Sequence, residues 1–315
     1  MIKEHDNFIY FLRVLNKYTD CTHPLSVKQI IEKFKEEYNE HITKQTVYNY
    51  LSMAESMDID INTCSKGKYL ASRQIEEGEA TFLIHSIISN RSLSEKYTKD
   101  LIEKIMSTQS IYYDPGVQNI YVCDKKNNRA LLLNVDLINK AIREKKKISF
   151  MYTKYDYDGE VIPYREKKYT VSPLFIISRD NKIYLVCKYD TQNTIFSFRV
   201  DKIVDVVITD YPIEIDTQLD PKQFSKHRLY MYSGRIQEFV LRCDEKVLDD
   251  VFDNFGKNIK PFNVCDGKFD ITVKTTEKAI KFFASQYINH VTVIYPVAVK
   301  EAIRDDLRNA LTKYY

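Results

Sequence analysis

The sequence predicts a multidomain α+β protein with a helical N-terminal domain, a strongly curved antiparallel sheet in its middle and a C-terminal α/β sandwich. Three patterns lead to this prediction. Apolar residues recur at helical spacing near the N-terminus, alternate in short bursts over residues 147–207, and follow alternating strand and helix patterns from residue 236. The predicted domains are residues 1–75, 76–134, 135–210 and 236–315.

Three short helices are predicted at the start of the chain. Residues 6–18 carry an apolar helical stripe, and Ser26 stands where it can cap a second helix. After a break at residues 39–41, Thr43 is placed to cap a third helix, KQTVYNYLSMAESM. A tight break before the last helix is typical of a helix-turn-helix. Residues 59–71 predict a two-stranded ribbon, which would complete a winged helix-turn-helix domain.

The third helix keeps a polar face once its apolar stripe is buried. Amide side chains can donate and accept at base edges, and Lys and Tyr can reach phosphate or base, so this face suits a DNA major groove. Lysines of the ribbon would reach backbone phosphates. The predicted DNA-contacting residues are Lys44, Gln45, Tyr48, Asn49, Ser52, Lys66 and Lys68. The alternative is that these are solvated residues of a three-helix bundle. The run Thr-Val-Tyr-Asn-Tyr-Leu-Ser resembles the recognition helix of winged-helix regulators.

Residues 76–108 predict two further helices, followed by an irregular, Tyr-rich connector at 111–130. These helices carry no catalytic pairing of side chains, so we interpret them as a linker that also pairs two subunits into a homodimer. A two-fold dimer suits DNA reading because half-sites lie one helical turn apart. The alternative is that the two helices only pack on the N-terminal domain.

The central segment, Lys147 to Val207, predicts about five strands, because turn-forming residues separate its apolar bursts. Cationic and hydroxyl side chains lie between the apolar positions, where a purely structural sheet would not need them. The predicted ligand-binding residues are Tyr152, Tyr184, Arg199 and Lys202, with Arg179 and Lys188 as cations at the rim. An arginine presents a planar fork to phosphate or carboxylate, a lysine adds a point charge, and a tyrosine can stack on a base. Two alternatives stay open: Tyr184 as a core residue, and Arg199 paired with Asp201 or Asp205.

Three spaced elements of this segment resemble the WYL domain of bacterial transcriptional regulators. They are Tyr-Thr-Val-Ser-Pro-Leu from Tyr169, Ile-Tyr-Leu-Val from Ile183 and Ser-Phe-Arg-Val-Asp-Lys-Ile from Ser197. The resemblance implies an Sm-like antiparallel β-barrel that binds an anionic ligand, either a nucleotide or a short single-stranded nucleic acid. A winged helix-turn-helix commonly precedes this domain.

Two positions depart from the WYL pattern. The triplet that names the domain reads Ile183-Tyr184-Leu185, so its Trp is absent, and the second arginine of the Arg-x-x-Arg pair is Lys202. We therefore expect a narrower stacking surface and the loss of one bidentate contact. The ligand chemistry should differ from that of relatives accordingly.

From Ile236 the chain follows a βαββαβ-like order, which predicts a small α+β sandwich with one sheet covered by helices. A connector with few apolar groups, at residues 209–235, precedes it, and a helix from Val297 to Tyr315 is expected to end it. This part resembles the C-terminal extension that often follows a WYL domain.

Composition and charge favour a cytoplasmic protein with cores of ordinary size. The chain has 315 residues, of which 44% are hydrophobic and 29% charged, and it has neither a membrane-length apolar run nor a signal-peptide core. Positive charge is concentrated at residues 140–204, with fourteen Lys or Arg against eight Asp or Glu. The first seventy residues carry nine Lys or Arg and ten Asp or Glu, a balance of charge that is unusual for a DNA-binding domain.

No motif in the sequence organises a reaction. A glycine-rich phosphate loop, Gly-x-Ser-x-Gly and His-Glu-x-x-His are all missing, the six histidines are isolated, and the six cysteines are scattered singly. We therefore predict no enzyme, no cofactor and no metal site.

The sequence is best interpreted as a DNA-binding transcriptional regulator that reads a double-stranded operator and senses an anionic ligand. The main rival is an RNA-binding or single-strand-binding accessory protein whose barrel is the working surface. A third class, a purely structural interaction protein, would have no affinity for nucleic acid.

Overall fold

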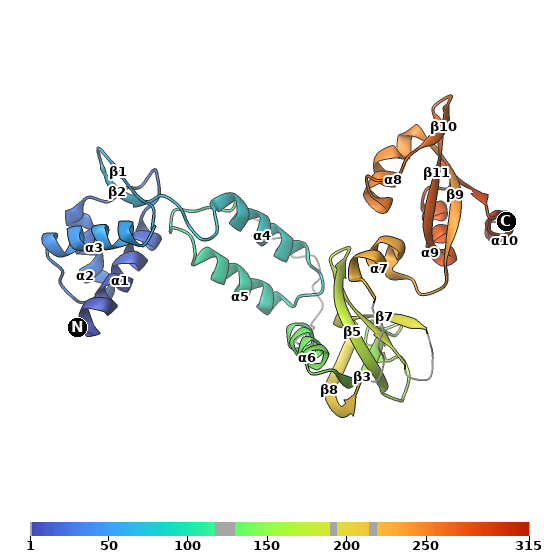
Figure 1. Cartoon of the computed structure of the whole chain (residues 1–315), viewed down its shortest axis with the longest axis horizontal. Helices are drawn as coiled ribbons and strands as arrows, with labels where there is room; N and C mark the ends of the chain where they lie inside the picture. The colour runs from blue at the N-terminus through green and yellow to red at the C-terminus, as the bar shows by residue number, and fades with distance from the viewer. Residues whose placement is uncertain (1, 117–129, 190–193, 214–218, 315) are drawn as a thin grey trace. The chain divides into compact units, whose positions relative to one another are not determined.

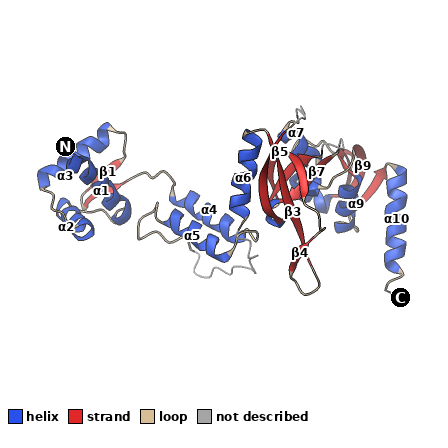
Figure 2. Cartoon of the chain, turned by 90° about the horizontal axis from the view of Figure 1, so that it is seen from below, coloured by secondary structure: helices blue, strands red, loops and turns tan. Residues whose placement is uncertain are grey.

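The computed structural model describes residues 2–116, 130–189, 194–213 and 219–314. The chain forms two compact units, Met1–Arg129 and Ala130–Tyr315. Helices and antiparallel sheets occur together, so the predicted mixed α+β class is confirmed (Figures 1 and 2). None of the described helices combines the length and the apolar character that a membrane span requires.

The first unit contains a three-helix domain, a two-stranded ribbon and a further pair of helices. Its described elements are α1 (Ile2–Tyr18), α2 (Val27–Tyr38), α3 (Lys44–Ser56), β1 (Ile61–Cys64), β2 (Gly67–Leu70), α4 (Glu77–Ser89) and α5 (Glu95–Met106). This order agrees with the periodicity of the sequence.

The core of the three-helix domain forms where the apolar stripes of α1, α2 and α3 meet. Phe11, Phe34 and Val47 are fully buried at its centre. Ser26 caps α2 in a capping box, and Thr43 caps α3 by accepting a hydrogen bond from the backbone. Both caps are those that the sequence predicts.

Backbone hydrogen bonds join the ribbon of β1 and β2 to the segment that precedes α2 in the sequence. Leu25 and Lys68 exchange two backbone hydrogen bonds, of 2.9 and 2.8 Å. Gly67 passes so close to this bridge that a Cβ atom there would lie 2.4 Å from the Leu25 carbonyl carbon. Only glycine fits at this position, and the bridge therefore fixes the ribbon to the three-helix domain.

The helices α4 and α5 pack against each other around a small core. Ala80, Ile84 and Tyr113 are buried in it. Phe82 and Leu83 lie outside this core and are 72% and 38% exposed. α4 thus carries apolar side chains that the first unit does not cover.

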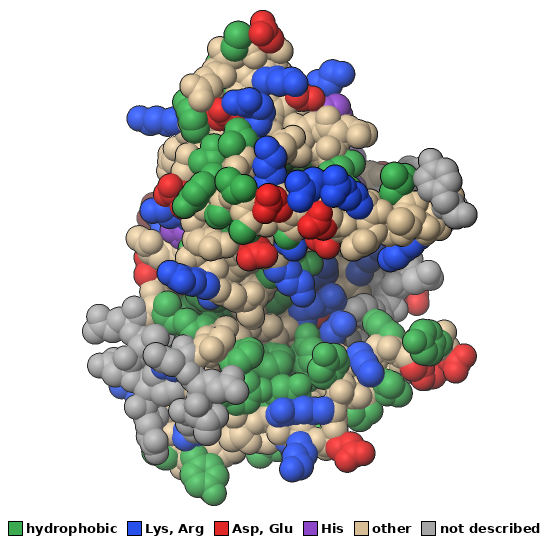
Figure 3. All heavy atoms as spheres, turned by 90° about the vertical axis from the view of Figure 1, so that its right-hand side faces the viewer, with side chains coloured by type: hydrophobic (Ala, Val, Ile, Leu, Met, Phe, Trp, Pro, Cys, Tyr) green, Lys and Arg blue, Asp and Glu red, His purple; other side chains and the backbone are tan. Residues whose placement is uncertain are grey.

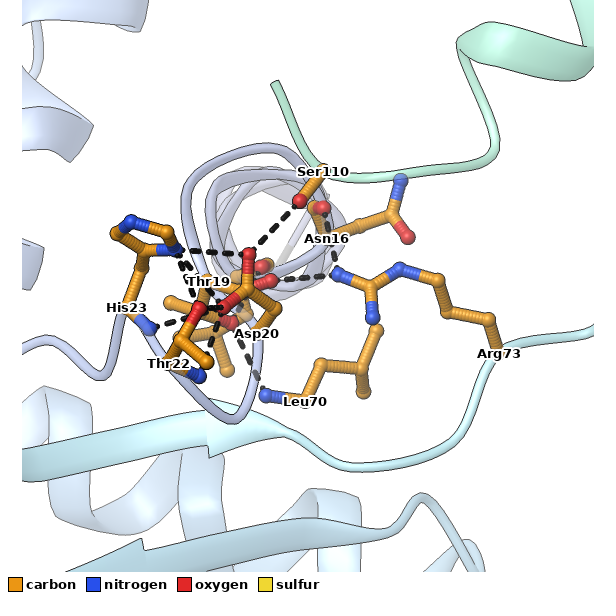
Figure 4. A network of polar contacts seen from close by, with 9 residues as sticks. Asn16, Thr19, Asp20, Thr22, His23, Leu70, Arg73 and Ser110 are labelled. Atoms are coloured by element: carbon orange, nitrogen blue, oxygen red, sulfur yellow. Dashed lines mark hydrogen bonds and ion pairs between the residues drawn. The ribbon is translucent and has the colours of Figure 1, made fainter. Parts of the chain in front are cut away.

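A network of polar contacts links the end of α1 to the segments that follow β2 and α5 (Figure 4). The buried Asp20 carboxylate accepts hydrogen bonds from Thr22, His23 and Ser110. Burial alone would raise the pKa of Asp20, but these hydrogen bonds outweigh burial and lower the pKa to about 2. Arg73 donates to two carbonyl groups at the end of α1. The charged network therefore ties the α4–α5 pair to the three-helix domain.

The first part of the second unit is a strongly curled sheet with one covering helix. Its elements are α6 (Leu131–Arg143), β3 (Lys146–Tyr155), β4 (Val161–Pro163), β5 (Tyr169–Arg179), β6 (Lys182–Lys188), β7 (Ile195–Arg199), the 3₁₀ turn η1 (Val200–Lys202) and β8 (Ile203–Pro212). The sequence favours a helix from Val135 to Lys146; the observed helix α6 begins four residues earlier and ends at Arg143, and a turn at Glu144 and Lys145 leads into β3.

The sheet curls because its long strands bend and pair with different partners along their length. The strands pair in the order β4-β3-β5-β6-β7, and β8 also pairs with β3. Register shifts interrupt β3 and β5, and such bulges increase the bend and twist of a strand. η1 connects β7 to β8, and no ladder between those two strands is found in the described part of the chain. The result is a half-barrel of six antiparallel strands.

Large apolar residues fill the inside of the half-barrel. Ile148, Phe150, Leu185 and Ile203 are fully buried there. α6 covers the sheet beside β3, β5 and β8, and the Asn134 side chain donates to the Ile203 carbonyl at 2.7 Å. α6 and these strands therefore pack together around one apolar core.

A short segment after β8 packs on the half-barrel and also enters the core of the C-terminal domain. It comprises α7 (Pro221–His227) and the 3₁₀ turn η2 (Leu229–Met231), which lie in the segment predicted as a connector with few apolar groups. Phe224 and Met231 pack on Val186 of β6, whereas Leu229 belongs to the C-terminal core. This segment joins the two parts of the second unit.

The C-terminal domain is a four-stranded antiparallel sheet with helices packed on it. Its elements are β9 (Ile236–Asp244), the 3₁₀ turn η3 (Glu245–Val247), α8 (Leu248–Phe255), β10 (Phe262–Cys265), β11 (Lys268–Thr276), α9 (Glu277–Gln286), β12 (Val291–Tyr295) and α10 (Val297–Leu311). The strand order β10-β11-β9-β12 in a βαββαβ chain is the ferredoxin-like arrangement. Phe239, Ile271 and Phe283 are fully buried between sheet and helices.

Candidate functional site

Arg199, the residue that the sequence analysis favours most as a ligand contact, is already engaged by Asp201. Its Nε donates to Asp201 Oδ1 at 3.0 Å and its Nη2 to Oδ2 at 2.7 Å. The side chain of Asp201 is 2% exposed and that of Arg199 is 24% exposed. Burial alone would lower the pKa of Arg199, but the Asp201 carboxylate raises it. Of the alternatives left open by the sequence, pairing with Asp201 is therefore the one that occurs.

The ion pair with Asp201 leaves the Nη1 donors of the Arg199 guanidinium available to another partner. The carboxylate occupies the edge formed by Nε and Nη2, and Nη1 is not used by it. A guanidinium has five N–H donors, so an exposed Arg199 edge can still bind an anion. Asp201 fixes the plane of that edge.

Two tyrosines lie beside Arg199. Tyr184 on β6 is paired in register with Arg199 on β7, so both side chains leave the same face of the sheet. Burial raises the pKa of Tyr184, against a lowering by the Arg199 charge. Burial also raises the pKa of Tyr152, against a backbone hydrogen bond with Arg199. Both phenols therefore stay protonated at neutral pH and can donate a hydrogen bond.

Tyr184 also has a structural role, which is the second alternative that the sequence leaves open. It packs beside the cluster of Val186, Phe224 and Met231. Substitution of Tyr184 would therefore alter both the surroundings of Arg199 and the packing of α7 on the sheet.

The three remaining predicted ligand residues differ in their surroundings. Arg179 donates from Nη1 to the Ser225 carbonyl at 3.0 Å, so it holds α7 against the sheet. Lys188 is half-buried at the end of β6, opposite Ile195. Lys202 lies in η1, where its carbonyl accepts a hydrogen bond from Thr153. All three remain candidates to supplement Arg199, and Arg179 also joins the sheet to α7.

The polar face of α3 is exposed and continuous. Lys44, Tyr48 and Ser52 follow one another at one-turn spacing, and Gln45 and Asn49 lie beside them. Gln45 Nε2 donates to Asn49 Oδ1 at 3.1 Å, which orients both amides. The Lys44 ammonium lies 6.0 Å from the Tyr48 ring centroid. The helix thus presents oriented donors and acceptors to solvent.

The two lysines of the ribbon differ in how available their ammonium groups are for phosphate contact. Lys66 is exposed at the turn, whereas the Lys68 ammonium donates to Thr63 Oγ1 at 2.8 Å. A groove of about 660 Å³ lies between α3 and the ribbon. Acidic side chains that the sequence analysis did not consider line it, namely Glu55, Asp58 and Asp60. Their negative charge disfavours a phosphate inside this groove.

The distribution of charge in the second unit is mixed. In the face of the molecule shown in Figure 3, Lys and Arg side chains gather in several groups with hydrophobic side chains between them. In the described ranges, no group of three or more His, Cys, Asp or Glu side chains is arranged to hold a metal ion. Acidic side chains lie among these basic groups on the same face, so charges of both signs share it with apolar side chains.

Comparison with known proteins identifies one domain. Residues 134–208 match the family model of the WYL domain, which runs from α6 into β8. A WYL domain is therefore present in this chain. A search of curated proteins found no match.

Two solved structures are similar over nearly the whole chain at low identity. Proteasome accessory factor B/C (PafBC) of Arthrobacter aurescens is 16% identical with a TM-score of 0.29, over 98% of this chain and 49% of that chain. A CRISPR Cas-related protein is 13% identical with a TM-score of 0.39, over 99% of this chain and 85% of that chain. The chain thus spans about half the length of the PafBC chain.

Proposed function

We propose that the protein is a DNA-binding transcriptional regulator in which the first unit reads an operator and the WYL domain senses an anionic ligand. The observation that carries this proposal is the exposed polar face of α3 in a chain that also contains a WYL domain.

The first unit is proposed to act as a winged helix-turn-helix. Its three-helix core, its capped third helix and its bridged ribbon have the layout of that module. The Gln45–Asn49 pair would meet base edges in the major groove, and Lys44 and Lys66 would meet phosphates. Lys68, Tyr48 and Ser52 would support these contacts.

The WYL domain is proposed to bind its ligand at Arg199. The exposed edge of the guanidinium would receive a phosphate or carboxylate, and the hydroxyl groups of Tyr152 and Tyr184 would donate to it. Lys188 and Lys202 would add positive charge nearby. Tyr184 also packs on the cluster that contains Phe224 of α7, so ligand binding would change the contacts of α7. Leu229, which follows α7, belongs to the C-terminal core, so the change would also reach the C-terminal domain.

Two copies are proposed to pair through α4 and α5. α4 exposes Phe82 and Leu83, and apolar side chains of this size are favourably buried in a subunit interface. A two-fold dimer would present two α3 helices to two half-sites.

The rival function is a single-strand-binding or RNA-binding protein that reads no operator, and the basic surplus of the central domain favours it. The two are separated by comparing duplex DNA from the protein's own upstream region with either of its single strands at low and moderate salt. The regulator should retain selective duplex binding, with an affinity that falls steeply as salt rises. Binding to the single strand alone, with no duplex selectivity at either salt concentration, would support the rival and contradict the regulator.

A further inference from the structure

An open cleft of about 560 Å³ lies in the first unit, where the three-helix domain meets the end of the α4–α5 pair. One wall of this α1–α5 cleft is formed by the second half of α1 and the last turn of α2. The other wall is formed by the end of α5 and the residues that follow it, up to Ile111. The volume lies within the range that is usual for small-molecule sites. The cleft is therefore large enough to hold a small organic molecule.

Hydrogen bonds hold the two walls of the α1–α5 cleft to each other. The Ile111 N–H donates to the Lys17 carbonyl at 2.9 Å. The Ser110 hydroxyl donates to the buried Asp20 carboxylate at 3.0 Å, within the network shown in Figure 4. The cleft is therefore formed without a ligand, and little ordering of its walls is required on binding.

Apolar side chains from both walls line the α1–α5 cleft. Val14 is 1% exposed in the core of the three-helix domain, and Tyr38 packs against that core with its ring stacked on Tyr10 at a centroid distance of 4.1 Å. On the other wall, Met106 packs on the small core of the α4–α5 pair, and Ile111 is 54% exposed. An apolar group that enters the cleft would leave water to contact these side chains, which favours binding.

The charged side chains that line the α1–α5 cleft are two cations, Arg13 and Lys17, and one carboxylate, Glu37. The Lys17 ammonium donates to the Glu37 carboxylate at 2.8 Å, and the Tyr18 hydroxyl donates to the same carboxylate. Arg13 is exposed, and within the described ranges it has no hydrogen bond or ion pair. One positive charge, that of Arg13, is therefore left for a ligand.

This combination of charge and apolar lining favours one class of ligand. A guanidinium presents a planar fork to a carboxylate, and a single negative charge would neutralise Arg13. Asn16 Nδ2 reaches the Ser107 carbonyl only at 3.4 Å, so this amide can also donate to a carboxylate. An organic cation would be repelled by Arg13, and a doubly charged phosphate would be repelled by Glu37. A singly charged acid with an apolar body is the best match.

We propose that the α1–α5 cleft binds a small monocarboxylic acid, whose carboxylate is held by Arg13 and whose apolar body lies between the two walls. This site is separate from the WYL domain, and the proposal does not depend on the proposed function. A ligand there contacts both α1 and the residues that follow α5. Its binding therefore stabilises the position of the α4–α5 pair against the three-helix domain.

The test is a titration of the full-length protein with phenylacetate, observed by NMR through the methyl groups of the methionines. The chain has six methionines, and the variant Met106→Leu identifies the signal of Met106, which lines the cleft. Two further probes separate the parts of the ligand, because acetate has the negative charge without the ring, and benzylamine has the ring with a positive charge.

The variants are Arg13→Ala and, as the matched control, Lys35→Ala. Each removes one exposed positive charge from the three-helix domain, and of the two residues Arg13 alone lines the cleft. Melting curves check that each variant is folded.

Phenylacetate should shift the Met106 signal to saturation with a Kd of roughly a few millimolar, the affinity expected for a ligand of about ten non-hydrogen atoms. Arg13→Ala should weaken this binding about tenfold, because a hydrogen-bonded charge pair is lost, whereas Lys35→Ala should bind like the wild type. Acetate and benzylamine should give no saturable shift over the same concentrations. Absence of a saturable shift with phenylacetate, or equal affinity in Arg13→Ala and wild type, would overturn this inference and leave the Arg199 site untouched.

Discussion

Arg199→Ala is expected to lower the free energy of unfolding of the second unit by about 3 kcal/mol. The variant would leave the Asp201 carboxylate, which is 2% exposed, without the guanidinium that neutralises it. Removing one partner of a buried ion pair costs far more than the pair contributes, because the remaining charge keeps its desolvation penalty. Arg199 is partly exposed, so water can offset some of this loss.

The measurement is urea unfolding of wild type, Arg199→Ala, Asp201→Asn and the double variant, followed by circular dichroism because the chain has no Trp. The double variant should be more stable than Arg199→Ala, since an asparagine buries no charge at this position. If Arg199→Ala unfolds at the same urea concentration as the wild type, Asp201 does not depend on Arg199. Binding studies on Arg199 should accordingly use conditions in which each variant is folded.

Simultaneous replacement of Lys44, Gln45 and Asn49 by Ala is expected to reduce selective duplex binding by about a hundredfold or more. Each lost base contact typically removes about 1–3 kcal/mol of discrimination. All three side chains are exposed on α3, so the fold of the first unit should be unaffected. Oligonucleotide binding by the WYL domain should be unchanged.

The matched control for this variant is Lys35→Ala in the last turn of α2. It also removes one exposed positive charge from the first unit, at a position outside α3, the ribbon and the α4–α5 pair. A gel-shift or anisotropy titration with the upstream duplex measures both variants. If both lose the same affinity, the effect is one of net charge, and the assignment of α3 as the reading helix is wrong.

The helices of the first unit were predictable because their stripes and caps are local signals. Ser26 and Thr43 each stand immediately before an apolar stripe, and both cap the helices that the sequence places there. The burial of Phe11, Phe34 and Val47 follows from those stripes. A packed core and its helix starts can therefore be read from nearby residues alone.

Several short elements of the second unit have no such signal. The strands β4 and β10 are edge strands of three and four residues whose side chains are mostly exposed, so each is too short for a pattern of apolar and polar residues to predict it. The helix α7 has only seven residues and buries one of them, Phe224. Asp220 at its N-cap and Pro221 in its first turn were the available signs of that helix.

The residue types of the candidate ligand site could be predicted from the sequence, but the partner of each side chain could not. The sequence singles out Arg199 and Tyr184, and the sheet register places them opposite each other. Which carboxylate pairs with Arg199 depends on the turn η1, which brings Asp201 back toward β7. The contact of Arg179 with the Ser225 carbonyl could not be predicted, because the packing of α7 is a tertiary feature.

The most direct test of the account is a titration of the upstream duplex with wild-type protein in the absence and presence of a saturating thymidine oligonucleotide. Sensing requires that the ligand bind two states of the protein with different affinity, and reciprocal coupling then changes duplex affinity by about fivefold or more in either direction. A duplex affinity that is the same with the oligonucleotide bound would contradict the coupling of sensor and reader. Absence of any selective duplex binding would contradict the regulator itself.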